Sequence, residues 1–165
     1  MSLATWADQP LEEARLLNPA FLGALLWACA SGHAQEKGRL PYPLAFLALP
    51  IVLHRATRTV LPRGIRTSLP AWLGAHPRVL VGFQERAGAL VPATKSALLF
   101  ATSNGLISVV DEGVRAAPRP RAMASFERET TDEVRECLKK AGFVGRWFAQ
   151  AGSATTVMAL WGVTP

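Results

Sequence analysis

The chain has 165 residues and a formal net charge of +6, and 50 % of its residues are hydrophobic. This length and composition predict a single domain, residues 1–165, with a sizeable core. Two apolar runs, residues 16–30 and 44–53, are shorter than the roughly 20 residues that span a bilayer. They argue against a membrane protein and predict buried helices.

Cysteine usage and the order of residues at the N-terminus bear on location. Cys29 and Cys137 show neither CxxC spacing nor a nearby histidine cluster, so neither a disulfide nor a metal site is indicated. Asp8, Glu12 and Glu13 precede the first apolar stretch, which is the wrong order for a secretory signal. We therefore expect a cytoplasmic location.

Residues 17–60 are predicted to form the N-terminal core helices. Asn18 followed by Pro19 marks a helix start, because Asn accepts from free amides of the first turn and Pro has no amide to leave unpaired. Gly32 marks the expected end of this helix. A polar connector then leads to a second apolar helix, residues 44–59, which Pro50 is expected to kink.

Residues 70–117 have the pattern of a winged helix-turn-helix core. The expected elements are a helical turn over 70–75, helices over 77–90 and 92–103, and a β-hairpin over 106–116 with its turn at residues 111–113. Helix, tight turn, helix and hairpin follow one another as in that motif. The predicted fold class is therefore mainly α (α+β): a winged helix-turn-helix-like helical domain with a small β-hairpin wing and a docked C-terminal helical segment.

The last part of the chain is predicted to be a loop followed by helices. Residues 118–130 contain two prolines and several arginines, which favours an exposed loop. Residues 131–165 are expected to form the C-terminal helices, the first capped by Thr131 and ended by Gly142. The final segment is dense in large side chains, so we expect it to dock on the core or on a partner.

Positive charge is concentrated in the middle of the sequence. Residues 37–84 contain seven Lys or Arg, two His and no Asp or Glu, a charge of +7 that exceeds the net charge of the chain. Such a surface suits an anionic partner, namely nucleic acid, anionic lipid or an acidic protein face, although a solvated surface without a ligand is the plainer alternative. The candidate nucleic-acid-binding residues are Arg55, Arg58, Arg63, Arg66, Arg78 and Lys95.

Within this set, Arg63 and Arg66 are the strongest candidates. They flank Gly64 in an expected loop, where a helix dipole does not account for them. The helix over residues 92–103, by contrast, carries Lys95 as its one charge. Nothing in that helix predicts reading of a base sequence.

No catalytic constellation is found in the sequence. P-loop, GxGxxG, GxSxG, HExxH and paired-carboxylate motifs are absent, and His33, His54 and His76 are widely separated. We expect no enzyme activity, no metal and no cofactor. The aromatic and basic residues Trp6, Arg146, Trp147 and Phe148 are the candidate partner-binding residues.

Three separated stretches carry a family resemblance. They are LNPAFL at residues 17–22; AFLALPIVLH at residues 45–54, followed by Thr57, Arg58 and LP at residues 61–62; and GRWFA at residues 145–149, followed by Gly162, Val163 and Pro165. From about residue 18 to residue 165 the chain resembles the middle component of three-component ABC systems. The matching positions are Asn18, Pro19, Pro50, His54, Arg58, Pro62, Gly145, Arg146, Trp147 and Phe148; Val144 and Thr164 depart from the pattern.

The resemblance implies a small bacterial accessory protein that acts with an ABC or SMC-like ATPase and a third, larger component against phages, plasmids or other mobile elements. It implies a non-catalytic adaptor with a winged-helix fold, and no membrane partner. Our first hypothesis is that the adaptor bridges the two partners and contacts DNA non-specifically through its Arg-rich surface. The alternative is a free-standing winged-helix transcription regulator.

Overall fold

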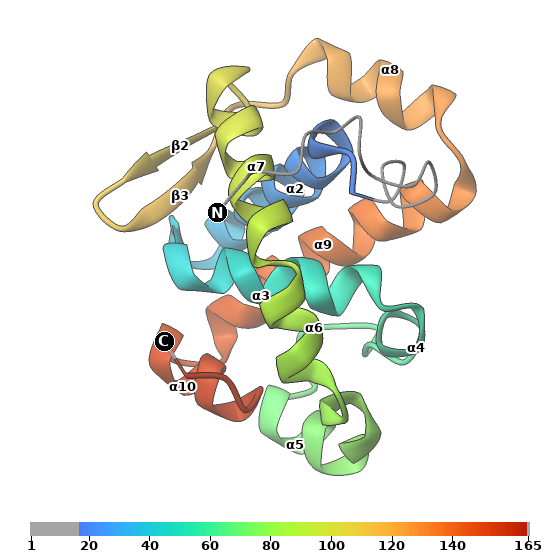
Figure 1. Cartoon of the computed structure of the whole chain (residues 1–165), viewed down its shortest axis with the longest axis vertical. Helices are drawn as coiled ribbons and strands as arrows, with labels where there is room; N and C mark the ends of the chain where they lie inside the picture. Colours follow the sequence, from blue (N-terminus) through green and yellow to red (C-terminus); the bar gives the residue numbers. More distant parts are fainter. Residues whose placement is uncertain (1–16, 165) are drawn as a thin grey trace.

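Two long helices, α2 (Pro19–Lys37) and α9 (Asp132–Gln150), cross at the centre of the computed structural model, which describes residues 17–164 (Figure 1). They pack against each other more extensively than any other pair of elements. The side-chain oxygen of Asn18 accepts from the amide of Ala20 at 2.8 Å, and that of Thr131 accepts from the amide of Val134 at 3.3 Å. Both predicted helix starts are therefore confirmed.

The predicted ends of these two helices are wrong. Helix α2 continues past Gly32 to Lys37, and the chain turns at Gly38 with φ of 76°. Helix α9 likewise continues past Gly142 to Gln150. Glycine often ends a helix, but Gly32 lies inside its helix for a different reason, which it shares with Gly145 of α9.

The reason is the close approach of the two helix backbones. A Cβ atom on Gly32 would lie 2.1 Å from the carbonyl oxygen of Gly142, and a Cβ atom on Gly145 would lie 1.9 Å from the carbonyl oxygen of Cys29. Any larger residue at Gly32 or Gly145 would force the helices apart. The missing side chains thus set the distance between α2 and α9.

The second apolar stretch forms two helices, α3 (Tyr42–Leu53) and α4 (Arg55–Arg58). We predicted one helix kinked at Pro50, but Pro50 lies within α3 and the break falls at His54. His54 has extended backbone angles, φ −80° and ψ 105°. Helix α3 is buried along most of its length, as predicted.

A small antiparallel sheet lies at one side of the helices (Figure 1). Its strands are β1 (Leu40–Pro41), β2 (Ile107–Val110) and β3 (Gly113–Ala116), in the order β1-β3-β2. The predicted hairpin is confirmed, with Asp111 and Glu112 in its turn at φ of 48° and 60°, as a tight two-residue turn requires. Strand β1 was not predicted, because two residues are too few to show an alternating pattern.

Between α4 and the hairpin lie α5 (Leu69–Ala75), the 3₁₀ helix η2 (Pro77–Leu80), α6 (Phe83–Ala89) and α7 (Val91–Ser103). Helix α7 confirms the predicted helix over 92–103. The predicted helix over 77–90 is divided, because the chain turns at Gly82 with φ of 69°. The fold is thus mainly helical, with 68 % helix and one small sheet, while the winged-helix assignment stays a prediction.

The segment predicted to be a loop, residues 118–130, contains helix α8 (Arg121–Glu129). The prolines that suggested a loop lie before its first turn, where Pro is tolerated. Met123 is buried beneath this helix. The loop prediction is therefore wrong for most of this segment.

The C-terminal segment ends in α10 (Ala154–Leu160), which is docked on the rest of the chain. Trp161 is buried, and its ring centroid lies 4.7 Å from that of Phe83 and 6.1 Å from that of Trp72. Trp72 also meets Trp147 edge to face at 5.2 Å. Within residues 17–164, no helix is long and apolar enough to cross a membrane.

Candidate anion-binding groove

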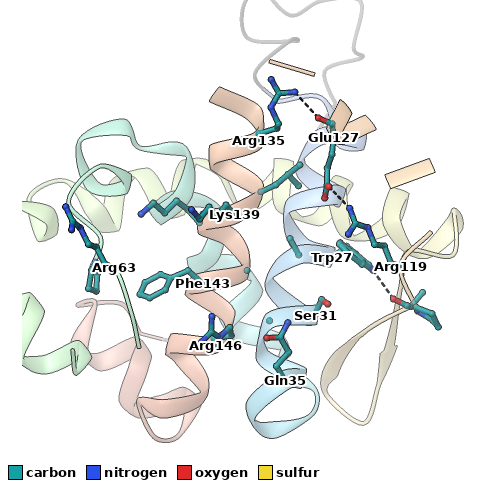
Figure 2. Close-up of a pocket in the computed structure, with 18 residues that line it drawn as sticks. Trp27, Ser31, Gln35, Arg63, Arg119, Glu127, Arg135, Lys139, Phe143 and Arg146 are labelled. Carbon is teal, nitrogen blue, oxygen red and sulfur yellow. Dashed lines mark hydrogen bonds and ion pairs between the residues drawn. The ribbon is translucent and has the colours of Figure 1, made fainter. Parts of the chain in front are cut away.

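A groove of about 720 Å³ is formed by α2, α9, the loop after α4 and the segment after β3. Figure 2 shows α9 between the loop that carries Arg63 and helix α2, which carries Trp27, Ser31 and Gln35. Six cationic side chains line it: Arg63, Arg119, Arg135, Lys139, Lys140 and Arg146. Glu127 is its one carboxylate among the described residues. We call this the cationic groove.

Helix α9 supplies most of these cations because its two faces carry opposite charges. Arg135, Lys139 and Arg146 are separated by four and seven residues, so they lie on one face of the helix. Glu133 and Glu136 lie on another face. Arg135, Lys139 and Arg146 are therefore separated in space from Glu133 and Glu136, whereas Asp132 lies beside Arg135 and pairs with it.

The acidic face of α9 is occupied by Arg58. Its Nη2 lies 3.1 Å from a carboxylate oxygen of Glu133, its Nε lies 3.7 Å from one of Glu136, and its Nη1 donates to the carbonyl of Val52 at 2.8 Å. Arg58 is 2 % exposed. This arginine links α4 to α9 and is unavailable to a ligand.

Three groove cations have carboxylate partners within the protein. Arg119 pairs with Glu127, Arg135 pairs with Asp132, and Arg146 lies 3.7 Å from Glu36. Arg135 also donates to the backbone carbonyls of Glu127 and Thr130, both at 2.9 Å, and so holds the end of α8. Among residues 17–164, Arg63, Lys139 and Lys140 form no ion pair, so they are the cations available to an anion.

Aromatic side chains contribute to the same groove. The indole of Trp27 is mostly buried and donates to the carbonyl of Ala117 at 2.9 Å, which ties α2 to the end of β3 (Figure 2). Phe143 is half-buried, and its ring lies 5.4 Å from that of Trp147. The groove thus combines cationic side chains with apolar walls.

The structure does not bring the six predicted nucleic-acid-binding residues together. Arg63 lies in the cationic groove and Arg66 is exposed on the same loop. Arg55 is exposed on α4, Arg78 lines a separate pocket, and Lys95 is exposed on α7. Arg58 was predicted as a surface cation, and this is corrected by its burial and by its ion pairs.

The predicted partner-binding residues also lie in different parts of the protein. Arg146 is half-exposed in the groove. Trp147 and Phe148 are each 1 % exposed, and the indole of Trp147 donates to the carbonyl of Thr67 at 2.7 Å. These two side chains belong to the core, which corrects the expectation that they form an exposed anchor. Trp6 lies outside the described residues.

Sequence reasoning missed four groove residues: Arg119, Arg135, Lys139 and Lys140. A sum of charges along the chain hides them, because acidic residues lie between them in sequence. The available signal was the spacing of Arg135, Lys139 and Arg146, which places three cations on one face of a predicted helix.

Among the described residues, Cys29, Cys137 and His54 have shifted pKa values. Burial raises the pKa of the Cys29 thiol to about 12. Burial also raises the pKa of Cys137, although the nearby Arg58 opposes this. The pKa of His54 is lowered by burial and by Arg86, which favours its neutral imidazole. Residues 17–164 contain no cluster of three or more His, Cys, Asp or Glu that could hold a metal ion.

The fold and the groove define a small, mainly helical protein with a groove lined by cationic side chains. The chain belongs to the family of ABC-three component (ABC-3C) system Middle Component 3, whose family model matches residues 6–165. The resemblance seen in the sequence is thereby confirmed, and the protein is a middle component of such a system, distinct from its ATPase. Neither a curated protein nor a solved structure was found to match the chain.

Proposed function

We propose that this protein is a non-catalytic cytoplasmic adaptor, which bridges an ABC or SMC-like ATPase and the third component of a defence system against phages, plasmids or other mobile elements. In that assembly, the cationic groove contacts the phosphate backbone of DNA. Membership of the middle-component family supports the accessory role. The observation that supports the DNA contact is the groove, where Arg63, Lys139 and Lys140 form no ion pair with the described residues.

The chemistry of the groove suits phosphates better than base edges. Lysine and arginine are the usual partners of phosphate oxygens, whereas base reading needs amide or guanidinium groups fixed in the major groove. Arg63, Lys139 and Lys140 reach the groove from two segments, α9 and the loop after α4. Such contacts bind DNA of any sequence and weaken as salt rises.

The alternative, a free-standing winged-helix regulator, is less well supported. Helix α7 would be its recognition helix, yet Lys95 is the one charged residue of α7, and its exposed face carries Leu99 at 70 % exposure. An exposed leucine with a single lysine provides few contacts to base edges. The winged-helix resemblance is therefore kept as part of the proposed fold and not as a proposed mode of DNA reading.

Charge reversal within the groove tests the proposed contact. We expect Lys139→Glu with Lys140→Glu to weaken binding of a short fluorescent DNA duplex and to lower the salt slope by about 2, because two phosphate contacts are lost. Binding is measured by anisotropy over a salt series, with the full-length chain and with its assembly.

The matched control reverses two exposed cations outside the groove, Arg66→Glu with Lys95→Glu. The net charge changes equally in both double variants, so a general charge effect would weaken both alike. Equal DNA affinity and equal salt slopes for the two double variants would reject the groove as the DNA-binding surface.

A further inference from the structure

A second pocket, of about 380 Å³, opens where α4, α5 and η2 meet. Its walls are largely apolar and include Val60, Ala75, Pro77 and Val79, together with Arg78. It shares no lining residue with the cationic groove. Nothing in the proposed DNA contact uses this pocket.

Exposed large apolar side chains occur at the pocket and next to its lining residues in the sequence. The described residues include five large hydrophobic side chains that are exposed, and three of these are Val60 at 40 %, Leu80 at 37 % and Val81 at 73 %. Val60 lines the pocket, and Leu80 and Val81 directly follow its wall residue Val79. We call Val60, Val79, Leu80, Val81 and Arg78 the apolar end surface.

The chain holds this surface in a fixed shape. Arg86 Nη1 donates to the carbonyl of Val81 at 2.9 Å, and its Nη2 donates to the carbonyl of Val79 at 3.3 Å. The turn at Gly82, with φ of 69°, ends the segment. Hydrogen bonds therefore hold the backbone at Val81 in place before a partner binds. Binding would then cost little conformational entropy at this residue.

The charged residues at the pocket are cationic. Among the described residues, none that lines the pocket is acidic; Arg78 lines it and is exposed, and Arg55 is exposed beside the lining residue Ala56. A partner segment that buries apolar side chains here therefore gains most if it also carries carboxylates. A phosphate polymer would leave the valines without a partner.

We propose that the apolar end surface is a protein-docking site for a segment of another component of the same assembly, in which apolar side chains fill the pocket and flanking Asp or Glu residues meet Arg78 and Arg55. The proposal rests on the proposed adaptor function for the existence of such a partner. It gives the bridging role a surface that is separate from the cationic groove, so protein and DNA could be bound together.

The test is co-purification of the tagged full-length chain with its co-expressed ATPase and third component, followed by measurement of Kd for the recovered partner. We expect Val81→Asp and Arg78→Glu each to weaken the partner by about tenfold or more, as at the centre of protein interfaces. Leu99→Asp and Lys95→Glu are the matched controls, because Leu99 is 70 % exposed on α7, away from this surface. Equal Tm values establish that all four variants are folded.

The outcomes separate this inference from the proposed function. If the wild-type chain binds a partner and both surface variants bind it within twofold of wild type, the docking site is rejected and the adaptor function stands. If the wild-type chain binds neither component, both are rejected. A homodimer that Val81→Asp disrupts would reassign the surface to self-association and overturn the proposal. Unchanged DNA affinity in Val81→Asp would show that the two surfaces act separately.

Discussion

The basic stretch of residues 37–84 and the cationic groove use positive charge in different ways. In the stretch, Arg58 is buried against two carboxylates, Arg39 pairs with Asp111 on the hairpin, and Arg55 and Arg78 lie apart from the groove. In the groove, most of the cations come from one helix, α9, whose three acidic residues nearly balance its four basic residues in a sum along the sequence. The difference shows that a sum of charges along the sequence does not predict a binding surface. The prediction also needs to know which charged side chains share a face and which are already paired within the protein.

The largest expected effect concerns the helix crossing on which the groove is built. Gly145→Ala places a methyl group against the carbonyl of Cys29, where backbone cannot yield, so we expect a loss of about 3 kcal/mol or more in the free energy of unfolding. Gly142→Ala, three residues away, meets its nearest neighbour, the carbonyl of Ala28, at 3.8 Å. This control should gain up to about 1 kcal/mol from helix propensity.

Urea unfolding monitored by circular dichroism measures both variants. A Gly145→Ala variant as stable as wild type would show that α2 and α9 do not need backbone contact. The groove would then lack the rigid wall that we assign to it.

A second expected effect compares two ion pairs that involve arginines of the basic stretch. Arg58→Met removes a buried hydrogen bond and two carboxylate contacts, and we expect it to cost about 2–3 kcal/mol of stability. Arg39→Met removes an exposed pair with Asp111, in which the two side chains are 38 % and 80 % exposed, and should cost less than about 1 kcal/mol. Thermal unfolding of the two variants gives the comparison, and equal losses would contradict the structural role of Arg58.

The smallest expected effect is the pH dependence of stability that arises from the Cys29 thiol, which is buried between α2 and α9. The folded pKa of Cys29 is raised to about 12 from an ordinary value of 9.0. Above about pH 9 the unfolded thiol loses its proton and the folded thiol keeps it, so the unfolded state is favoured as pH rises. This thiol should remove about 1 kcal/mol of stability between about pH 9 and pH 10.

Cys29→Ala removes this titration, and its stability should fall less steeply over the same pH range. Urea midpoints at several pH values measure the difference between the two slopes. Parallel pH profiles for wild type and variant would show that Cys29 ionises as easily in the folded protein as in the unfolded chain.

Local signals in the sequence predicted much of the fold. The caps at Asn18 and Thr131, the α7 helix and the hairpin were all anticipated, because each depends on residues close together in the chain. Gly142 was also expected to end a helix, although α9 continues through it. Gly32 misled because a glycine that allows close packing and one that ends a helix look alike in sequence. Which role applies depends on a helix that is distant along the chain.

The candidate site was less predictable for the same reason. Arg63 was singled out as a loop residue that a helix dipole does not explain, and the structure places it among the residues that line the groove. Lys139 and Lys140 were not singled out: they precede Gly142, where α9 was expected to end, and cations near a helix end need no ligand to explain them. The burial of Trp147 depends on Trp72 and Phe143, and no local pattern revealed which aromatic residues would be enclosed.

The crossing of α2 and α9 also has a consequence for synthesis of the protein. Helix α2 ends at Lys37 and its main partner begins at Asp132, so the ribosome must add a long stretch of chain before the two can meet. At about 5–20 residues per second, completing α9 takes many seconds. Throughout that interval the apolar surface of α2 lacks its covering helix. A chain truncated before Gln150 should therefore be recovered in the insoluble fraction of the cell.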